Sequence, residues 1–337
     1  MPLLFACHPL TGDEPCAQGG DGVGRVIASR RVPYRLAVRQ DGGKAWEMEH
    51  EIDFGHRAPT ARPLDATWIH GSPSAKHNTD PDIQVHAYDE HTYILRQNKA
   101  VHYEAPFLFL LFGNERAVLI DTGATEAPEH FPLRRVVDGL IGTWRASHPR
   151  DRYRLLVLHT HGHSDHVAAD GQFADRPETD VIPAGIDEAW TYLGLAADPD
   201  RTVRLDLGGR VLECLATPGH HEAAVTYYDP CTGILLTGDT VYRGRLYVDR
   251  WDDFRRTVHR LADFADTHPV THVLGCHIEM STTPGRDYPV RTTYQPEEPP
   301  LEMTAGHLRQ LRDAVDDIAG REGVHVYDDF IVHNRQG

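Results

Sequence analysis

Short apolar runs separated by polar loops begin at about residue 83, which is the pattern of a layered α/β or αββα domain. Five of these runs end at or just before a histidine or an aspartate: residues 117–120, 155–158, 211–215, 234–236 and 273–274. Loops that follow strands ending on one edge of a rigid scaffold lie together. We therefore expect these five loops to form a single site.

Helical periodicity is found in three segments, residues 165–174, 251–265 and 304–318. In the last of them Thr304 is placed to cap the helix, and the apolar residues that recur at helical spacing are Leu308, Leu311, Val315 and Ile318.

The first 78 residues are rich in Gly, Pro, Asp and Arg and differ from the rest of the chain. We expect a partly ordered N-terminal extension there, with one hairpin in which residues 34–39 and 45–51 flank the turn at Asp41. Residues 79–285 are predicted to form the catalytic domain. Residues 286–337, a Pro-rich segment and a helix, are predicted to complete it.

Composition and charge narrow the classes of partner. With 337 residues, 40% of them hydrophobic, the chain can bury a large core without disulfides. Its net charge of -16, from 34 basic and 50 acidic residues, argues against nucleic acid. Five scattered cysteines without Cys-x-x-Cys spacing, and no apolar stretch typical of a signal peptide or membrane span, favour a cytoplasmic protein. A small-molecule substrate is expected, and a homodimer stays open.

The chain has 23 histidines, and several of them cluster after the run 155–158 in the order His161, His163, Asp165, His166. Zinc binds neutral imidazole nitrogen and carboxylate oxygen, and hydrolytic sites keep one position open for water or substrate. Three imidazoles and an adjacent carboxylate supply those ligands. A metal centre is therefore predicted here.

This cluster resembles the His-x-His-x-Asp-His signature of the metallo-β-lactamase superfamily, and His220, Asp239 and His277 follow in the family's order. The resemblance covers roughly residues 85–280 and implies an α+β fold, an αββα sandwich of two mixed sheets flanked by helices. It implies two zinc ions, with iron or manganese as alternatives. The first metal would be held by His161, His163 and His220, the second by Asp165, His166 and His277, and Asp239 would bridge both. Asp121 would orient ligand loops from behind.

By this resemblance the chain would be a dinuclear-zinc hydrolase of a small carbonyl substrate, a thioester, lactone, ester or amide, attacked by a metal-bridging hydroxide. Asp165 would accept or relay a proton. Tyr242, three residues after Asp239, resembles the tyrosine that lactone-hydrolysing relatives direct at the substrate. A core tyrosine at the sheet edge is an equally weighted alternative.

Other polar residues near these motifs are assigned more weakly. His159 and His221 are surplus to the pattern and are interpreted as structural. Residues 93–107 are expected to form a loop beside the site. This loop carries Arg96, Lys99, His102 and Glu104, which could contact the substrate. A solvated loop without substrate contact is the favoured interpretation.

Several competing functions use the same residues. A glyoxalase II-like thioesterase is the nearest named activity, but the C-terminal segment offers few basic residues for glutathione carboxylates. A β-lactamase is disfavoured because no export signal is seen, and a tRNA-processing nuclease because the chain is acidic. An iron-dependent oxygenase such as a persulfide dioxygenase is the main alternative, and a non-catalytic binding protein is disfavoured because no ligand of the pattern is missing.

Overall fold

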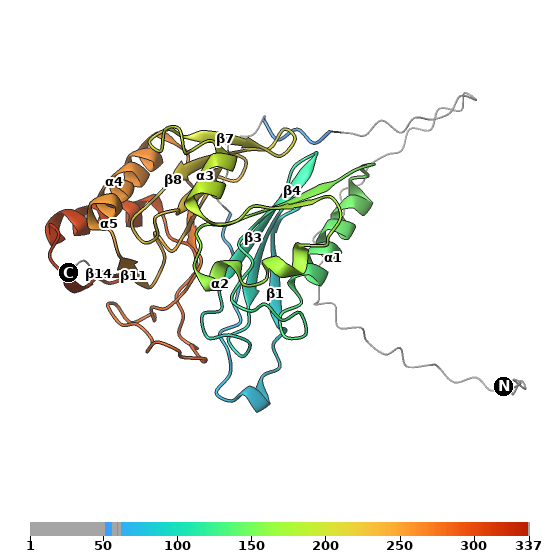
Figure 1. The fold of residues 1–337 in the computed structure, drawn as a ribbon. Helices are drawn as coiled ribbons and strands as arrows, with labels where there is room; N and C mark the ends of the chain where they lie inside the picture. Colours follow the sequence, from blue (N-terminus) through green and yellow to red (C-terminus); the bar gives the residue numbers. More distant parts are fainter. Residues whose placement is uncertain (1–50, 56–58, 60–61, 336–337) are drawn as a thin grey trace, which may run out of the picture. The chain divides into compact units, whose positions relative to one another are not determined.

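Figure 1 shows the computed structural model, which describes residues 51–55, 59 and 62–335. The chain divides into the units Met1–Asp41 and Gly42–Gly337, and every described residue belongs to the second. The hairpin expected from residues 34–39 and 45–51 lies outside the described residues, except for Glu51.

The first sheet has six strands in sequence order: β1 (Ile83–Asp89), β2 (Thr92–Gln97), β3 (Phe107–Phe112), β4 (Arg116–Ile120), β5 (Arg154–Leu158) and β6 (Thr179–Val181). The strands β1 to β4 are antiparallel, and β4, β5 and β6 are parallel. Every residue of β3, with the sequence FLFLLF, is buried. A strand that is apolar on both sides fits the middle of a layered domain, where both faces of the sheet are covered.

The second sheet has the strand order β12-β10-β9-β8-β7. Its strands are β7 (Val203–Asp206), β8 (Val211–Ala216), β9 (Val225–Asp229), β10 (Ile234–Gly238) and β12 (His272–Gly275). Only β10 and β12 pair in parallel. A third, small sheet, which the sequence did not predict, joins β11 (Arg245–Val248), β14 (Ile331–Asn334) and β13 (Gly323–Val326).

The two large sheets and the helices outside them form four layers, and three hydrophobic clusters fill the spaces between these layers. One lies between the two large sheets and contains inward residues such as Phe109 and Tyr227. A second lies between the first sheet and α1 (Leu133–Ser147), and a third packs the other face of the second sheet against α4 (Trp251–Thr267) and α5 (Ala305–Ile318). Figure 1 shows α4 and α5 side by side, with α1 against the other sheet. The αββα arrangement expected from the sequence is confirmed.

A buried ion pair ties the two large sheets together. The guanidinium of Arg210 donates to both carboxylate oxygens of Asp229, at 3.2 and 2.5 Å, and to the carbonyls of His91 and Phe112. Its fifth bond reaches the hydroxyl of Thr92. All of the donors are used, which is how a charge is accommodated in a protein interior.

The predicted helices are only partly as expected. Residues 251–265 lie within α4, and α5 begins at Ala305 with Thr304 as its N-cap, as expected. The single helix expected over 165–174 is wrong, because α2 (Ser164–Val167) ends after one turn and a 3-10 helix, Asp170–Phe173, follows. The carbonyl of His166 accepts the N–H of Thr122, and the N–H of Ala168 donates to Gly123, so the loop after β4 takes over the bonds that would continue the helix.

The remaining differences concern segments that were assigned to loops or not assigned. The helices α1 and α3 (Ile186–Leu193) were not predicted, and a 3-10 helix spans Ala75–His77. The first part of the loop expected over residues 93–107 belongs to β2. Among the described residues, no helix has the length and apolar character to span a bilayer.

Candidate metal centre

The five strand ends expected to share one site do meet. The strands β4, β5, β8, β10 and β12 are followed respectively by Asp121, His159–His166, His220, Asp239 and His277. All seven residues predicted as metal ligands fall into two adjoining groups of converging nitrogen and oxygen atoms. Because each side chain follows a strand of a buried sheet, the scaffold holds the whole constellation in place.

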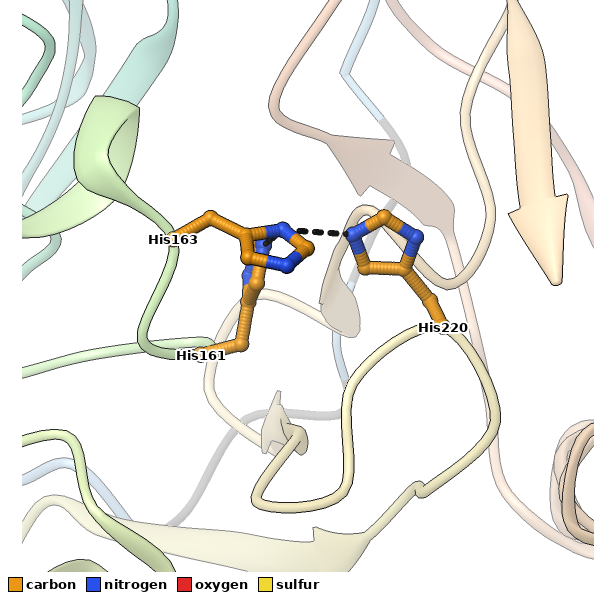
Figure 2. Close-up of side chains that lie close together, drawn as sticks. All are labelled: His161, His163 and His220. Carbon is orange, nitrogen blue, oxygen red and sulfur yellow. Dashed lines mark hydrogen bonds between the residues drawn. The ribbon is translucent and has the colours of Figure 1, made fainter. Parts of the chain in front are cut away.

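The first group consists of His161, His163 and His220. Figure 2 shows His163 and His220 facing each other from two separate loops. Nδ1 of His163 lies 2.9 Å from Nε2 of His161 and 3.0 Å from Nε2 of His220. Three imidazole nitrogens thus point at a common centre.

The second group consists of Asp165, His166, Asp239 and His277. Nε2 of His277 lies 3.4 Å from Oδ2 of Asp165 and 3.3 Å from Oδ1 of Asp239. Nε2 of His166 lies 3.6 and 3.5 Å from the same two oxygens. The four separations are nearly equal, as they are when atoms surround one central position.

Asp239 faces both groups with different oxygens. Its Oδ1 faces His166 and His277, while its Oδ2 lies 3.7 Å from Nε2 of His220 and 4.0 Å from Nε2 of His161. Oδ1 of Asp239 and Nε2 of His166 are buried and have no hydrogen-bond partner. Buried polar atoms without a partner are rare, so both atoms are placed to bind a cation.

The far nitrogens of the histidines are held by the protein. Nδ1 of His166 faces Oδ2 of Asp121 at 2.9 Å, Nδ1 of His220 faces the carbonyl of Tyr247 at 2.8 Å, and Nδ1 of His277 faces the carbonyl of Glu104 at 3.2 Å. Since each acceptor fixes the proton on Nδ1, the lone pair of Nε2 points into the centre.

Asp121 is placed behind the centre, as the sequence predicted. Its Oδ1 accepts the backbone N–H of Thr160, and its Oδ2 accepts the hydroxyl of Thr160 and the thiol of Cys276. Its φ of 67° lies in the left-handed region, which Asp tolerates better than most residues. The strained turn aims the carboxylate at the back of His166.

The electrostatics differ between the two groups. Burial, together with the other histidines, lowers the pKa of His161 well below its usual value and that of His163 to about 4. Burial acts the same way on His166 and His277, but the carboxylates around them outweigh it and raise both pKa values well above the usual one. His161 and His163 are therefore neutral imidazoles near neutral pH, whereas the carboxylates of the second group favour positive charge among these four residues, which either a proton or a metal cation can supply.

The family is decided by comparison with known sequences. Residues 105–291, more than half of the chain, match the model of the metallo-beta-lactamase superfamily. The chain belongs to this superfamily. The match includes every residue of both groups, and the resemblance inferred from the motif is thereby confirmed.

Curated relatives within the superfamily are named as hydrolases. The chain is 31% identical over 152 residues to a hydroxyacylglutathione hydrolase of Rhizobium meliloti (strain 1021), covering 43% of this chain and 54% of that protein. It is 28% identical over 204 residues to the human acyl-coenzyme A thioesterase MBLAC2, covering 50% of this chain and 72% of that protein. The chain thus spans about half the length of the first of these superfamily members.

Among solved structures, the chain resembles a metallo-beta-lactamase from Pontibacter korlensis, with a TM-score of 0.45 and 16% identity over 70% of this chain and 99% of that one.

Tyr242 lies beside the superfamily site, but its hydroxyl contacts the protein. The hydroxyl donates to the carbonyl of Arg245 at 2.6 Å and approaches Oε2 of Glu279 at 3.2 Å, and the ring packs edge-on against His277. This geometry favours the core tyrosine over a substrate-directed phenol. A catalytic role for Tyr242 stays a prediction.

The two histidines that are additional to the superfamily motif, His159 and His221, lie near the centre. His159 is buried with Nε2 at 3.2 Å from Asp170, and His221 lies against His163 with a ring-centroid distance of 5.0 Å. Neither belongs to the two groups.

The residues of the predicted loop are divided between two environments. Arg96 is on β2, fully buried and bidentate to Glu298, so the solvated loop is wrong for this residue. Lys99 is also buried, whereas His102 and Glu104 are half-buried.

Sequence reasoning missed the contributions of Thr160 and Cys276 to this superfamily site. Thr160 precedes His161 and binds Asp121, and Cys276 precedes His277 and binds the same carboxylate. Their adjacency to two predicted ligands was the available signal. The carbonyls of Tyr247 and Glu104 leave no such signal, because any residue type supplies a carbonyl.

Proposed function

We propose that this chain is a dinuclear-zinc hydrolase that cleaves a small carbonyl substrate, a thioester, lactone, ester or amide. The observation that carries the proposal is Asp239, whose two carboxylate oxygens face two separate groups of ligand atoms. A carboxylate whose two oxygens face two different ligand groups can bridge two cations, because each oxygen can bind one of them.

The donor set fits zinc. Ligand atoms about 2.0–2.1 Å from a tetrahedral zinc ion lie roughly 3.3 Å from one another. The nitrogen–oxygen separations in the second group are 3.3 to 3.6 Å, and the nitrogen separations of 2.9 and 3.0 Å in the first group are close to that value. His161, His163 and His220 would hold one ion, Asp165, His166 and His277 the other, with Asp239 shared.

When bound, such ions supply a nucleophile from water at neutral pH and polarise a carbonyl oxygen. The residues of this chain would hold both ions at one edge of the sandwich, and Asp121 fixes the orientation of His166. Burial would raise the pKa of Asp165, but its hydrogen bond to His277 and the positive charge of His166 and His277 hold it at about 2. Asp165 is therefore a carboxylate near neutrality, as a metal ligand must be, and its role as a proton acceptor stays a prediction.

A thioester is the first substrate class to examine, because one relative is named a thioesterase and another a hydrolase of an acyl conjugate. The complete second group favours a hydrolase over the one-iron oxygenase, since all three of its ligands and the bridging carboxylate converge.

The test is hydrolysis of thioester, lactone and β-lactam reporters by zinc-loaded protein, compared with Asp239→Asn. This variant keeps the size of the side chain and removes its charge. We expect kcat/KM for the best reporter to fall by at least about 100-fold. Asp263→Asn, an exposed change on α4, is the matched control and should leave the rate unchanged. Equal activity in Asp239→Asn, or no turnover of any reporter by zinc-loaded wild type, would contradict the proposal.

A further inference from the structure

His221 follows the proposed ligand His220 in the sequence and lies beside the first ligand group. Five of the seven ligand residues are buried, and only His163 and Asp165 are partly exposed. A substrate that comes from solvent therefore approaches the centre past these two residues. The ring of His221 is also partly exposed, and it packs perpendicular to the ring of His163 with 5.0 Å between their centroids. His221 thus borders the side from which a substrate arrives.

The Nε2 edge of the His221 ring lies over Gly162, the residue between two ligands of the first group. A Cβ atom added to Gly162 would lie 3.5 Å from both Nε2 and Cε1 of His221. Gly162 is itself exposed. Because glycine has no side chain, nothing at this position covers the Nε2 edge of the ring.

The backbone determines which nitrogen of His221 carries the proton. The N–H of Ala223 donates to Nδ1 of His221 at 3.1 Å, so Nδ1 must present its lone pair. In the neutral imidazole the proton is then on Nε2. Within the part of the chain that the structure describes, no acceptor binds this N–H. His221 therefore offers one oriented and unused donor next to the first ligand group.

The proposed metal ligands have the opposite arrangement. In His166, His220 and His277, Nδ1 faces an oxygen acceptor, and the lone pair of Nε2 points into the centre. In His221, Nδ1 faces a donor, so Nε2 presents a hydrogen and not a lone pair. His221 is therefore unsuited to bind a cation through Nε2, and it is suited to bind an oxygen.

Hydrolysis of a carbonyl compound needs such a donor. The carbonyl oxygen gains negative charge as the nucleophile attacks, and a donor that is already in place stabilises this charge without reorganisation. The imidazoles of the first group cannot supply it, because their inward nitrogens are the proposed metal ligands. The donor must come from a residue outside the ligand set, and His221 is adjacent to that set.

We propose that His221 is a catalytic residue, which donates a hydrogen bond from Nε2 to the carbonyl oxygen of the substrate. The bond becomes stronger as the oxygen gains negative charge in the transition state. This inference rests on the proposed function and adds a residue to its site. The ring keeps its proton and stays neutral throughout, so no bond to His221 is formed or broken. The N–H of Ala223 holds the donor in its orientation.

Two amide variants separate this role from a structural one. In His221→Asn, Oδ1 can accept the N–H of Ala223, but no atom takes the place of Nε2. In His221→Gln, the amide N–H can reach that place. With zinc-loaded protein and its best reporter, we expect kcat to fall about 100-fold in His221→Asn and at least about tenfold to be recovered in His221→Gln. Zinc affinity should be unchanged in both. His77→Asn, at an exposed histidine, is the matched control.

A second measurement needs no turnover. Long-range ¹⁵N–¹H correlation spectra of labelled protein report the tautomer of each histidine, and the resonances that are missing in His221→Asn identify His221. We expect its proton on Nε2. In zinc-loaded wild type, phenyl methylphosphonate, whose tetrahedral oxygens resemble an attacked carbonyl, should shift the Nε2 resonance of His221 and leave that of His77 in place.

Several outcomes would overturn the inference. They are a proton on Nδ1 of His221, an Nε2 resonance that the phosphonate does not shift, and a kcat in His221→Asn within about threefold of wild type. A loss of zinc affinity in His221→Asn, with no recovery in His221→Gln, would also overturn it, because the role would then be structural. In all these cases wild type still hydrolyses a reporter, whereas the proposed function fails when wild type hydrolyses none.

Discussion

The carboxylate of Asp121 lies behind His166, with Oδ2 at 2.9 Å from Nδ1, while Nε2 of His166 points at the second ligand group. Asp121 contacts none of the ligand atoms of the centre, but its hydrogen bond orients the imidazole of His166, whose Nε2 is one of them. We expect this link to be measurable as metal affinity.

Asp121→Asn should weaken zinc binding by about 10- to 100-fold, because the amide loses the charge that orients His166. Asparagine tolerates the left-handed φ of this position, so the turn itself is retained. Zinc affinity measured with a competing chelator tests this. Asp175→Asn, at a side chain that is 84% exposed, is the control. An unchanged affinity in Asp121→Asn would show that the carboxylate does not orient the ligand.

The positions of the ligands could be predicted because each follows an apolar run that must be a strand. His220, Asp239 and His277 are far apart in the sequence, yet the fold brings them together since their strands end at one edge. The short α2 could not be predicted, because its end depends on hydrogen bonds from Thr122 and Gly123, which no local pattern reveals.

The buried pair Arg210–Asp229 should be important for stability. Asp229→Asn would leave a buried guanidinium without its anion, which we expect to lower the free energy of unfolding by about 3–5 kcal/mol at neutral pH. Urea unfolding measures this. The double variant Arg210→Met with Asp229→Leu should recover part of the loss. A loss below about 1 kcal/mol in Asp229→Asn would contradict the role of the pair.

The stability that the Arg210–Asp229 pair contributes depends on pH. Burial would raise the pKa of Asp229, but Arg210 and the hydrogen bonds around the carboxylate hold it below 3.8. The stabilisation is therefore complete above about pH 4 and is lost as the pH falls through the depressed pKa. The difference between wild type and Asp229→Asn should shrink in that acidic window only.

Tyr242→Phe separates the two interpretations of this tyrosine. Its hydroxyl binds the carbonyl of Arg245, so we expect a loss of about 1–2 kcal/mol of stability and less than about a threefold change in turnover rate. Tyr192→Phe, at an exposed ring, is the matched control. If turnover instead slowed by about two orders of magnitude, the phenol would have to turn toward the substrate during the reaction.

Gly219 allows the loop that carries His220 to pass close to α4. Its φ is 146°, and an added Cβ would lie 2.5 Å from Cα of Phe254. Gly219→Ala should cost about 1–3 kcal/mol of stability and weaken zinc binding, because His220 must move with the loop. Gly142→Ala, in α1 with open space around it, should be neutral or stabilising. Unfolding curves that reverse this order would contradict the packing argument.

The burial of Lys99 shows where sequence reasoning ends. Residue type and position suggested only a loop lysine, because burial by residues 279–295 is a long-range consequence of the fold. The occupation of Glu298 by Arg96 is equally invisible in sequence, since the two are 202 residues apart.

We propose that the seven converging residues hold two zinc ions, with Asp239 between them. The most direct measurement is a zinc titration of metal-free protein, followed by elemental analysis after dialysis, for wild type and Asp239→Asn. We expect two zinc ions per wild-type chain and a marked loss of zinc affinity in the variant. Retention of one ion per chain in both proteins, or preferential retention of one iron when both metals are offered, would contradict it.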